Sequence, residues 1–453
     1  MLNQLNRRQF IQTSTAIGIG LYVSGRAAGA NTSKKHVINV ALLGAGAQGQ
    51  VLMSAILKKQ DSGVRFMAVC DIWEKGNLRR VSRQMEGYGK AYGYKGTPYT
   101  DYREMLDKEK DLDAVIVATP DFWHSEHTCA CLEKGLHVYC EKEMSNTIEG
   151  AKKMLDTAKE TGKLLQIGHQ RRSNPRYRHC YDRLIRDAGL IGQITTINGQ
   201  WNRSRASCED LGWPEGTEID TATLNKYGFK DMQQFRNWRW YKGLGGGPIV
   251  DLGSHQIDIY SWFLGCNPKS VIASGGVDYW RGHEWYDTVM AVYEYDTPTG
   301  IVRAFYQTGT TNSNGNYFET FMGDEGTLTI AEDPGYGGVY REGWVEEKTW
   351  DKWVQGGYIR KPKGAPVRKG DSDAEAVLDV RSSVPPDLYT IPVTMNVPFH
   401  QPHLMNFFNS IRGEDTLNCP GEIGYETAVS VLKVNEAVEK QRRLEFKPED
   451  FHV

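Results

Sequence analysis

The sequence predicts an α/β protein whose N-terminal part folds as a doubly wound parallel sheet, and two observations support this. From Val37 onward, short apolar runs alternate with helical patterns near residues 47–59, 74–86 and 121–134, and the turn after the first run is rich in glycine. The apolar runs read VINVALL, RFMAVCD, DAVIVAT and LHVYCE. Continuous apolar strands that alternate with amphipathic helices are typical of a parallel sheet with both faces covered.

The length and charge of the chain bound its organisation and its partners. With 453 residues the chain is too long for one ordinary domain, so we expect two. The formal net charge is -2, which gives no electrostatic footprint for nucleic acid, and none is expected as a partner. The basic run from His169 to His179 is therefore interpreted as a local anion or substrate contact, or as a solvated face.

The first thirty residues are interpreted as a targeting signal. Adjacent Arg7 and Arg8 precede the short apolar stretch TAIGIGLYVSG and the small residues AAGA, which end at Ala30. Residues 1–30 resemble a twin-arginine signal peptide, which predicts export to the periplasm or beyond and no membrane span after cleavage. An uncleaved anchor is the alternative. Twin-arginine export carries folded proteins, so it suits a chain that acquires a tightly held cofactor before export.

The glycine-rich turn GAGAQG predicts a dinucleotide site. Gly44 would allow the tight turn, Gly46 would let the pyrophosphate approach the backbone, and Gly49 would let helix and strand pack closely. The following helix N-terminus would face the phosphates with its partial positive charge. The intervening Ala45 and Gln48 are assigned to the same cofactor-binding turn.

Asp71 ends the second apolar run, where an acidic residue would accept hydrogen bonds from the adenosine ribose. Its charge would repel a 2'-phosphate, so NAD is favoured over NADP. Asp71 could instead cap the next helix, and the nearby Arg79 and Arg80 leave NADP possible.

Further cofactor contacts are expected where later strands end. In a doubly wound sheet the ligand lies beyond the carboxyl ends of the strands, and Thr119, Pro120, Glu141 and Lys142 occupy such ends. His124 is a further candidate, although a histidine near a helix start more often packs or caps.

The motifs GAGAQG, ATPDFWH, HVYCEKE and GGGPIVDLGSHQID, in this order and together with Asp71, resemble the Gfo/Idh/MocA family of glucose-fructose oxidoreductases and inositol dehydrogenases. The resemblance implies an NAD(P)-binding Rossmann domain over residues 36–168. It also implies a C-terminal substrate and oligomerisation domain over residues 169–453, with an open, mainly antiparallel sheet. One face of that sheet would carry helices and the other would pack on another subunit, which predicts a homo-oligomer, a dimer or a tetramer.

The same resemblance implies that Lys142, Asp251 and His255 surround the reacting carbon. A neutral His255 would accept the hydroxyl proton, Asp251 would orient the substrate or support the imidazole, and Lys142 would supply positive charge. Helical spacing predicts that Asp251, His255 and Asp258 share one helix face, with Asp258 as a structural partner. The family's Glu-Lys-Pro motif has Glu143 in place of proline, which would add a negative charge near the lysine.

These features predict an NAD(P)-dependent oxidoreductase that acts on a ring hydroxyl of a sugar or glycoside, with carbon 3 of a glucoside as the first candidate. An NAD-dependent glycosidase that oxidises its substrate transiently is the alternative. A metal-dependent isomerase or hydrolase built on Asp251 and His255, and a non-catalytic NAD-binding protein, are more remote. Several tryptophans flank the candidate segment, but core packing is their commoner use, so none is assigned to the sugar.

Overall fold

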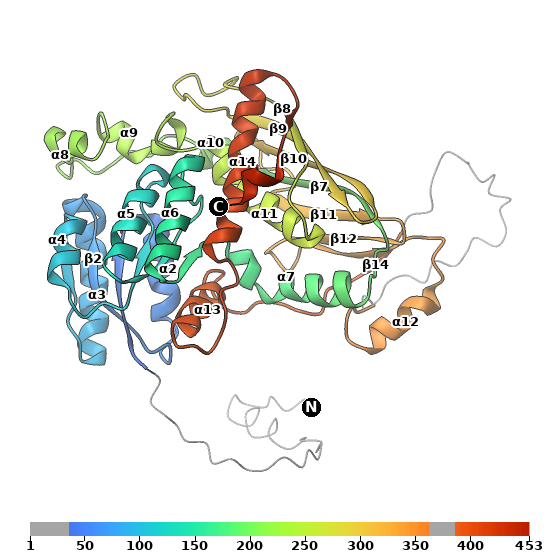
Figure 1. Ribbon diagram of the computed structural model, residues 1–453, viewed down its shortest axis with the longest axis horizontal. Coiled ribbons are helices and arrows are strands. Elements are labelled where there is room, and N and C mark those ends of the chain that lie inside the picture. Colours follow the sequence, from blue (N-terminus) through green and yellow to red (C-terminus); the bar gives the residue numbers. More distant parts are fainter. Residues whose placement is uncertain (1–35, 362–385, 453) are drawn as a thin grey trace, which may run out of the picture. The chain divides into compact units, whose positions relative to one another are not determined.

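The computed structural model describes residues 36–361 and 386–452, and Figure 1 shows the arrangement of their helices and strands. The signal expected in residues 1–30 lies outside the described residues. Within the described part of the chain, no helix is both long and apolar enough to cross a membrane.

The first sheet has six strands in the order β3-β2-β1-β4-β5-β6, and every pair of neighbours is parallel. The sheet reverses its order between β1 and β4, so the carboxyl ends of these two strands open the crevice in which doubly wound sheets bind ligands. The predicted doubly wound sheet is confirmed. Its strands are β1 (Ile38–Leu43), β2 (Val64–Cys70), β3 (Thr97–Tyr99), β4 (Ala114–Val117), β5 (His137–Cys140) and β6 (Leu165–Ile167).

Helices cover both faces of this sheet, as its continuous apolar strands require. Local chemistry sets their ends: α6 begins where the Thr147 side chain accepts a hydrogen bond from the Gly150 amide, and it ends at left-handed Gly162. The helix expected near residues 74–86 begins as a π-helical turn, Glu74–Leu78, and becomes α-helical only afterwards. The helices are α2 (Ala47–Leu57), α3 (Arg79–Tyr92), α4 (Tyr102–Lys108), α5 (Asp121–Glu133) and α6 (Ile148–Thr161).

The second sheet has nine strands in the order β14-β13-β12-β11-β7-β10-β9-β8-β15. Only β7 and β10 pair in parallel, so the expected open, mainly antiparallel sheet is confirmed. Its strands are β7 (Ile194–Asn202), β8 (Ser270–Gly276), β9 (Thr288–Thr297), β10 (Gly300–Gly309), β11 (Tyr317–Gly323), β12 (Gly326–Ile330), β13 (Gly337–Arg341), β14 (Asp387–Tyr389) and β15 (Leu444–Glu445).

Helices α11 (Gly253–Leu264) and α14 (Gly421–Lys440) lie against one face of the second sheet (Figure 1). Tyr260 of α11 is buried there and donates a hydrogen bond to the carbonyl of Phe305 at 3.0 Å. The opposite face leaves Ile272 and Met290 about half exposed. That exposure suits the expected homo-oligomer, which stays a prediction. Shorter helices are α7 (Pro175–His179), before the sheet, and α12 (Glu347–Gln355), after β13.

Helix α13 (Gln401–Ile411) does not follow the predicted domain boundary. Its Leu404, Phe407 and Phe408 pack with Val40 and Tyr139 in the apolar core of the first sheet. The chain therefore returns to the dinucleotide domain near its C-terminal end, although the sequence assigned all of residues 169–453 to the second domain. Helical periodicity locates such a helix but does not say which apolar surface it covers.

The segment between β7 and α10 (Gly247–Asp251) lies over the dinucleotide domain. It contains α8 (Thr221–Lys226) and α9 (Met232–Arg236), which Figure 1 places beside that domain. The indole of Trp73 donates to the carbonyl of Thr217 at 2.6 Å, and the indole of Trp123 donates to that of Tyr227 at 3.0 Å. Apolar side chains from both parts form one buried cluster. This segment thereby covers the side of the first sheet where a dinucleotide would lie.

Candidate active site

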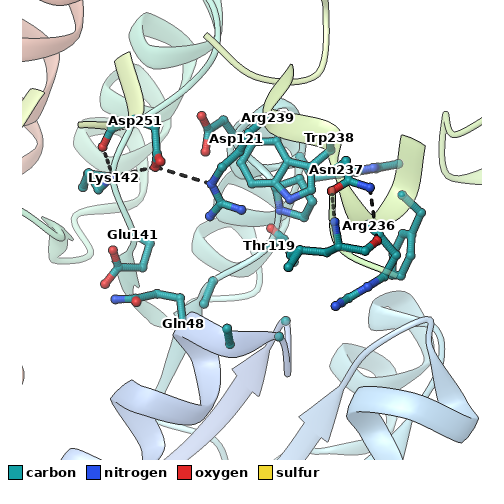
Figure 2. Close-up of a pocket in the computed structure, with 18 of the residues that line it drawn as sticks. Gln48, Thr119, Asp121, Glu141, Lys142, Arg236, Asn237, Trp238, Arg239 and Asp251 are labelled. Atoms are coloured by element: carbon teal, nitrogen blue, oxygen red, sulfur yellow. Dashed lines mark hydrogen bonds and ion pairs between the residues drawn. The ribbon is translucent and has the colours of Figure 1, made fainter. Parts of the chain in front are cut away.

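A cavity of about 680 Å³ lies where the carboxyl ends of the parallel strands meet the second domain. Its lining comes from the glycine turn after β1, the ends of β2, β4 and β5, the segment between β7 and α10, the adjoining residues 248–255, strand ends of the second sheet, and His400. Figure 2 shows Gln48 and Glu141 on the side of the glycine turn, with Lys142 and Asp251 beyond them.

The glycine turn has the geometry that a pyrophosphate needs. Gly44 has φ +98°, and a Cβ there would come within 2.5 Å of the Ala118 carbonyl oxygen. A Cβ on Gly49 would meet the Gly44 carbonyl oxygen at 2.0 Å, so the close packing of helix and strand requires glycine. Gly46 lines the cavity, and a Cβ there would have only the Asn77 amide nitrogen nearby, at 3.8 Å. The turn therefore fits the expected cofactor, with α2 directed at its phosphates.

Asp71 lines the cavity but is also tied to the protein backbone. One carboxylate oxygen accepts from the amide of Ala45, the other from the amide of Trp73, each at 2.8 Å. Burial raises the pKa of Asp71, and these hydrogen bonds oppose the rise. Asp71 thus fixes the glycine turn and begins the next helical turn, while it keeps acceptor capacity for a ribose hydroxyl. The two functions proposed from the sequence are compatible.

The arginine beside Asp71 is one that the sequence did not indicate. Arg79 and Arg80 are exposed and do not line the cavity. Arg236 of α9 lines it instead, with its guanidinium 4.9 Å from the centre of the Trp73 ring. It is close enough to Asp71 for its charge to lower the pKa of that carboxyl. Arg236 lies 165 positions after Asp71 in the chain. Tertiary folding of the segment between β7 and α10 brings the two residues together.

The strand ends supply most of the other predicted cofactor contacts. Thr119, Pro120 and Glu141 line the cavity, as does Gln48. His124 does not, because its Nδ1 lies 2.7 Å from the Glu143 carbonyl oxygen and its Nε2 lies 2.7 Å from that of Thr119. The predicted cofactor contact of His124 is therefore wrong: the ring ties two strand-end loops together. Ala45 and Gly49 also lie off the cavity and shape the turn from behind.

Lys142 and Asp251 form an ion pair in the cavity. The Lys142 Nζ lies 3.0 Å from Oδ1 of Asp251 and also donates to the backbone carbonyl of that residue. Arg239 Nε lies 3.5 Å from the same Oδ1 (Figure 2). Burial alone would raise the pKa of Asp251, but the charges of Lys142, Arg239 and Arg203 outweigh it and hold that pKa well below its usual range. Asp251 is therefore a carboxylate at neutral pH.

Glu143 does not add the negative charge that the sequence suggested. The Lys142–Glu143 peptide bond is cis, and the Glu143 side chain is fully buried, with one oxygen accepting from the Met144 amide at 2.8 Å. Burial raises the pKa of Glu143 to about 8, so most of this carboxyl is protonated at neutral pH. The replacement of proline leaves Lys142 in the cavity.

His255 is separated from Asp251 by a break in the helix. Helix α10 ends at Asp251 and α11 begins at Gly253, so the expected single helix face is interrupted at Leu252. Burial, followed by the charges of Lys142 and Arg171, holds the pKa of His255 well below its usual range. Its Nδ1 is buried without a hydrogen-bond partner among the described residues. The imidazole is neutral and lines the cavity, as a general base requires.

Asp258, one turn further along α11, has the expected structural function. Its carboxylate receives two hydrogen bonds from the Arg172 Nε, at 2.8 and 3.0 Å, and one from the Thr427 hydroxyl at 3.1 Å. Arg172 belongs to the basic run after β6, so this part of the run is a buried structural pair.

Several cavity residues carried no signal in the sequence. Asp121, at the start of α5, lines the cavity, and burial raises its pKa to about 7. His400 reaches the glycine turn, where its Nε2 lies 3.5 Å from the Gln48 amide nitrogen. Glu332, just after β12, also lines the cavity. No group of three or more His, Cys, Asp or Glu in the described residues is arranged to hold a metal ion.

The fold and the cavity together define a two-domain protein with the fold of a dinucleotide-binding domain. Two family models match the chain: "Oxidoreductase family, NAD-binding Rossmann fold" over residues 38–169, and "GFO/IDH/MocA C-terminal domain" over residues 183–329. Together they account for more than half of the chain, which belongs to the Gfo/Idh/MocA family. The first domain is therefore an NAD-binding Rossmann domain.

Individual relatives share part of the chain. D-glucoside 3-dehydrogenase of Escherichia coli (strain K12) is 30% identical over 229 residues, 50% of this chain and 54% of that protein. Alpha-N-acetylgalactosaminidase of Shewanella oneidensis is 28% identical over 184 residues, 36% of this chain and 39% of that protein. The chain thus spans about half or less of the length of these relatives. Levoglucosan dehydrogenase, in a complex with NADH and levoglucosan, matches the fold with a TM-score of 0.65 and 16% identity, covering 91% of this chain and 100% of that one.

Proposed function

We propose that this protein is an NAD-dependent oxidoreductase that oxidises a ring hydroxyl of a sugar or glycoside, with carbon 3 of a glucoside as the first candidate. The observation that carries the proposal is the presence of Lys142, Asp251 and His255 in the same cavity as the glycine turn. The partial similarity to D-glucoside 3-dehydrogenase supports the carbon position. NADP remains the alternative cofactor because Arg236 lies near Asp71.

The three side chains divide the work on the substrate hydroxyl. Neutral His255 accepts the hydroxyl proton, because its lowered pKa leaves a ring nitrogen free to bind it. Lys142 stabilises negative charge on the substrate oxygen as the proton leaves, and Asp251 fixes the position of the lysine. NAD would be bound by Gly44, Gly46, Gln48, Asp71, Thr119 and Pro120, and it would take up the hydride.

We further propose that the purified protein retains NAD without its being added. The segment between β7 and α10 covers the Asp71 end of the cavity with Phe229, Phe235 and Trp238, all of which line it. Its hydrogen bonds to Trp73 and Trp123 would have to break before the dinucleotide could leave. Retention also suits the twin-arginine signal and the periplasmic or external location proposed from residues 1–30, where free NAD is expected to be scarce.

Glycosidase chemistry is the second candidate, favoured by the partial similarity to alpha-N-acetylgalactosaminidase. There, transient oxidation would acidify the neighbouring C–H bond, the aglycone would leave by elimination, water would add to the resulting unsaturated ketone, and the hydride would return from the nicotinamide to the carbonyl carbon. His255 could serve the same proton transfer, so the site alone is compatible with both reactions.

Product analysis separates the two reactions. The purified protein is incubated with a panel of alkyl and aryl glycosides, and the products are identified by mass spectrometry. We expect a product two hydrogens lighter than the glycoside, with nicotinamide reduced in equal amount. Free aglycone with no net redox change would support the glycosidase, and no reaction with any sugar would contradict both.

A further inference from the structure

Two strand ends in the middle of the second sheet form an aromatic wall in the cavity. Trp201 of β7 and Tyr317 of β11 are directly paired across neighbouring strands, so their side chains lie on the same face. Their ring centres are 4.7 Å apart, and the Trp201 ring centre is 5.4 Å from that of His255. Both aromatic residues line the cavity. The wall therefore begins at the proposed general base, with Trp201, and continues to Tyr317 on the neighbouring strand.

A buried polar pair lies beside this wall. Glu332 and Gln170 both line the cavity and are 6% and 5% exposed. The Gln170 amide nitrogen is 3.4 Å from Oε1 of Glu332, while the Gln170 amide oxygen is buried without a partner among the described residues. A buried amide oxygen left without a partner costs free energy unless a ligand or water donates to it.

Arg171, the cation beside Glu332, is shared with a second carboxyl group, so Glu332 is able to bind a ligand. Arg171 lies 3.4 Å from Oε2 of Glu332, but the same guanidinium also binds Glu319 and lies over the Trp201 and Tyr317 rings. One arginine thus faces two carboxyl groups. Arg203 also lines the cavity, and its guanidinium lies 5.5 Å from the centre of the Trp201 ring, the part of the wall that is next to His255.

We propose that Glu332 and Gln170 form a hydroxyl-binding subsite that selects an uncharged, polyhydroxylated ring and rejects sugars that carry a carboxylate or phosphate at that position. Sugar hydroxyls would donate to the Glu332 carboxylate and to the free Gln170 oxygen, as charge-assisted and neutral hydrogen bonds. The C–H face of the ring would lie on Trp201 and Tyr317. An anionic substituent would meet the Glu332 carboxylate and lose its hydration without a matching cation.

The subsite rests on the proposed function, because its ligand is the sugar that His255 deprotonates. Glu332 reaches the cavity beside Arg171, whose guanidinium lies over the Trp201 and Tyr317 rings, so in this proposal it binds a part of the sugar away from the reacting carbon. Its loss should weaken sugar binding in the ground state and the transition state alike. The half-saturating sugar concentration should then change, and the limiting rate should not.

The test compares Glu332→Gln with the wild-type holoenzyme in single-turnover reduction of bound NAD, using a methyl glucoside and the matching methyl glucuronide. We expect the half-saturating glucoside concentration to rise roughly tenfold or more, the value of a hydrogen bond to a charged group, while the limiting rate changes little. The preference for glucoside over glucuronide should fall by a similar factor. Asp333→Asn is the matched control, since it removes a charge from the neighbouring exposed residue.

An unchanged half-saturating concentration and an unchanged preference in Glu332→Gln would overturn the subsite. Should that variant fail to fold by thermal unfolding, Gln170→Leu keeps every charge and must still raise the half-saturating concentration, and an unchanged value there overturns the subsite equally. If the wild-type protein oxidises neither sugar nor any other in the glycoside panel, the proposed function fails and the subsite fails with it. Wild-type oxidation with unaltered variants contradicts the subsite alone.

Discussion

The Lys142 Nζ lies 3.0 Å from Oδ1 of Asp251, so the two charges of the candidate active site compensate each other, while the neutral His255 stands outside the pair. This arrangement separates two tasks. In the proposed reaction, stabilisation of negative charge would depend on the ion pair, and proton transfer would depend on the imidazole.

Replacement of either group should abolish most turnover without loss of cofactor. We expect His255→Ala and Lys142→Met each to slow single-turnover reduction of bound NAD by roughly two to four orders of magnitude. Bound NAD, measured by mass spectrometry after denaturation, should remain because the glycine turn and Asp71 are untouched. The exposed His452→Ala serves as the control. Wild-type rates in both variants would contradict the assignment.

Asp251→Asn tests the ion pair itself. The amide keeps the shape of the side chain but leaves Lys142 without its carboxylate, so we expect the limiting rate to fall by about one to two orders of magnitude. The fall should be smaller than for Lys142→Met, since the backbone carbonyl of residue 251 still accepts from the lysine. A rate equal to that of the wild type would show that the charge of Asp251 has no part in the reaction.

The rate should depend on pH in the way that a neutral buried histidine predicts. Because burial and nearby cations lower the pKa of His255, the imidazole stays unprotonated as the pH falls through 6.5, the usual value for histidine. Single-turnover rates should thus stay level between pH 8 and pH 6.5 and decline only below it, over the range in which the enzyme remains folded. Half-loss of the rate close to pH 6.5 would mean that the group controlling the reaction is an ordinary exposed histidine.

Buried histidines should make the fold sensitive to acid. Burial lowers the pKa of His127 to about 3 and that of His169 to about 4. A lowered pKa in the folded state stabilises the fold above the unfolded-state pKa of 6.5, and this stability is lost as the pH falls from 6.5 toward 4. Each of the two contributes a loss of about 1.4 kcal/mol per pH unit in that window.

The predicted acid sensitivity is checked by measuring the thermal unfolding midpoint as a function of pH. His127→Phe keeps the ring packed on Trp123 and Tyr102 but cannot be protonated, so its midpoint should fall less steeply below pH 6.5 than that of the wild type. Parallel curves for the two proteins would contradict the prediction.

Cofactor choice should respond in opposite directions to two neighbouring residues. Asp71→Asn removes the carboxylate that repels a 2'-phosphate and keeps a side chain that can hold the glycine turn, so the preference for NAD should weaken about tenfold. Arg236→Gln removes the cation and should strengthen that preference. The affinities of the apo protein for NAD and NADP, measured by calorimetry, give the ratio. The exposed Arg79→Gln is the matched control, and an unchanged ratio in both test variants would remove these residues from cofactor selection.

Local sequence patterns predicted the parts of the site whose chemistry lies within one short segment. The structure places Gly44, Gly46 and Gly49 in the turn as the motif predicts: a Cβ on Gly44 or Gly49 would collide with backbone atoms, and Gly46 lines the cavity. His124 was not, because its partners are the carbonyl oxygens of Thr119 and Glu143, and backbone acceptors leave no mark in the sequence. Arg236 and Glu332 reach the cavity only through tertiary folding, which brings together segments without any fixed spacing.

The helix break at Leu252 also depends on tertiary folding. Spacing alone placed Asp251 and His255 on one helix face, whereas the packed structure ends α10 at Asp251 and begins α11 at Gly253. A Cβ on Gly253 would come within 2.9 Å of the Tyr306 ring, a contact with a strand of the second sheet. Such a contact between distant segments cannot be deduced from helical periodicity.

The return of α13 to the first sheet also decides how the polypeptide can be divided. A fragment that stops at residue 168 would carry all six parallel strands but would leave Val40 and Tyr139 without the phenylalanines that cover them. Its surface would then expose an apolar patch of the kind that drives self-association. The dinucleotide domain is therefore discontinuous in the chain, and a soluble, autonomous version of it would need residues 401–411 joined to its own C-terminus.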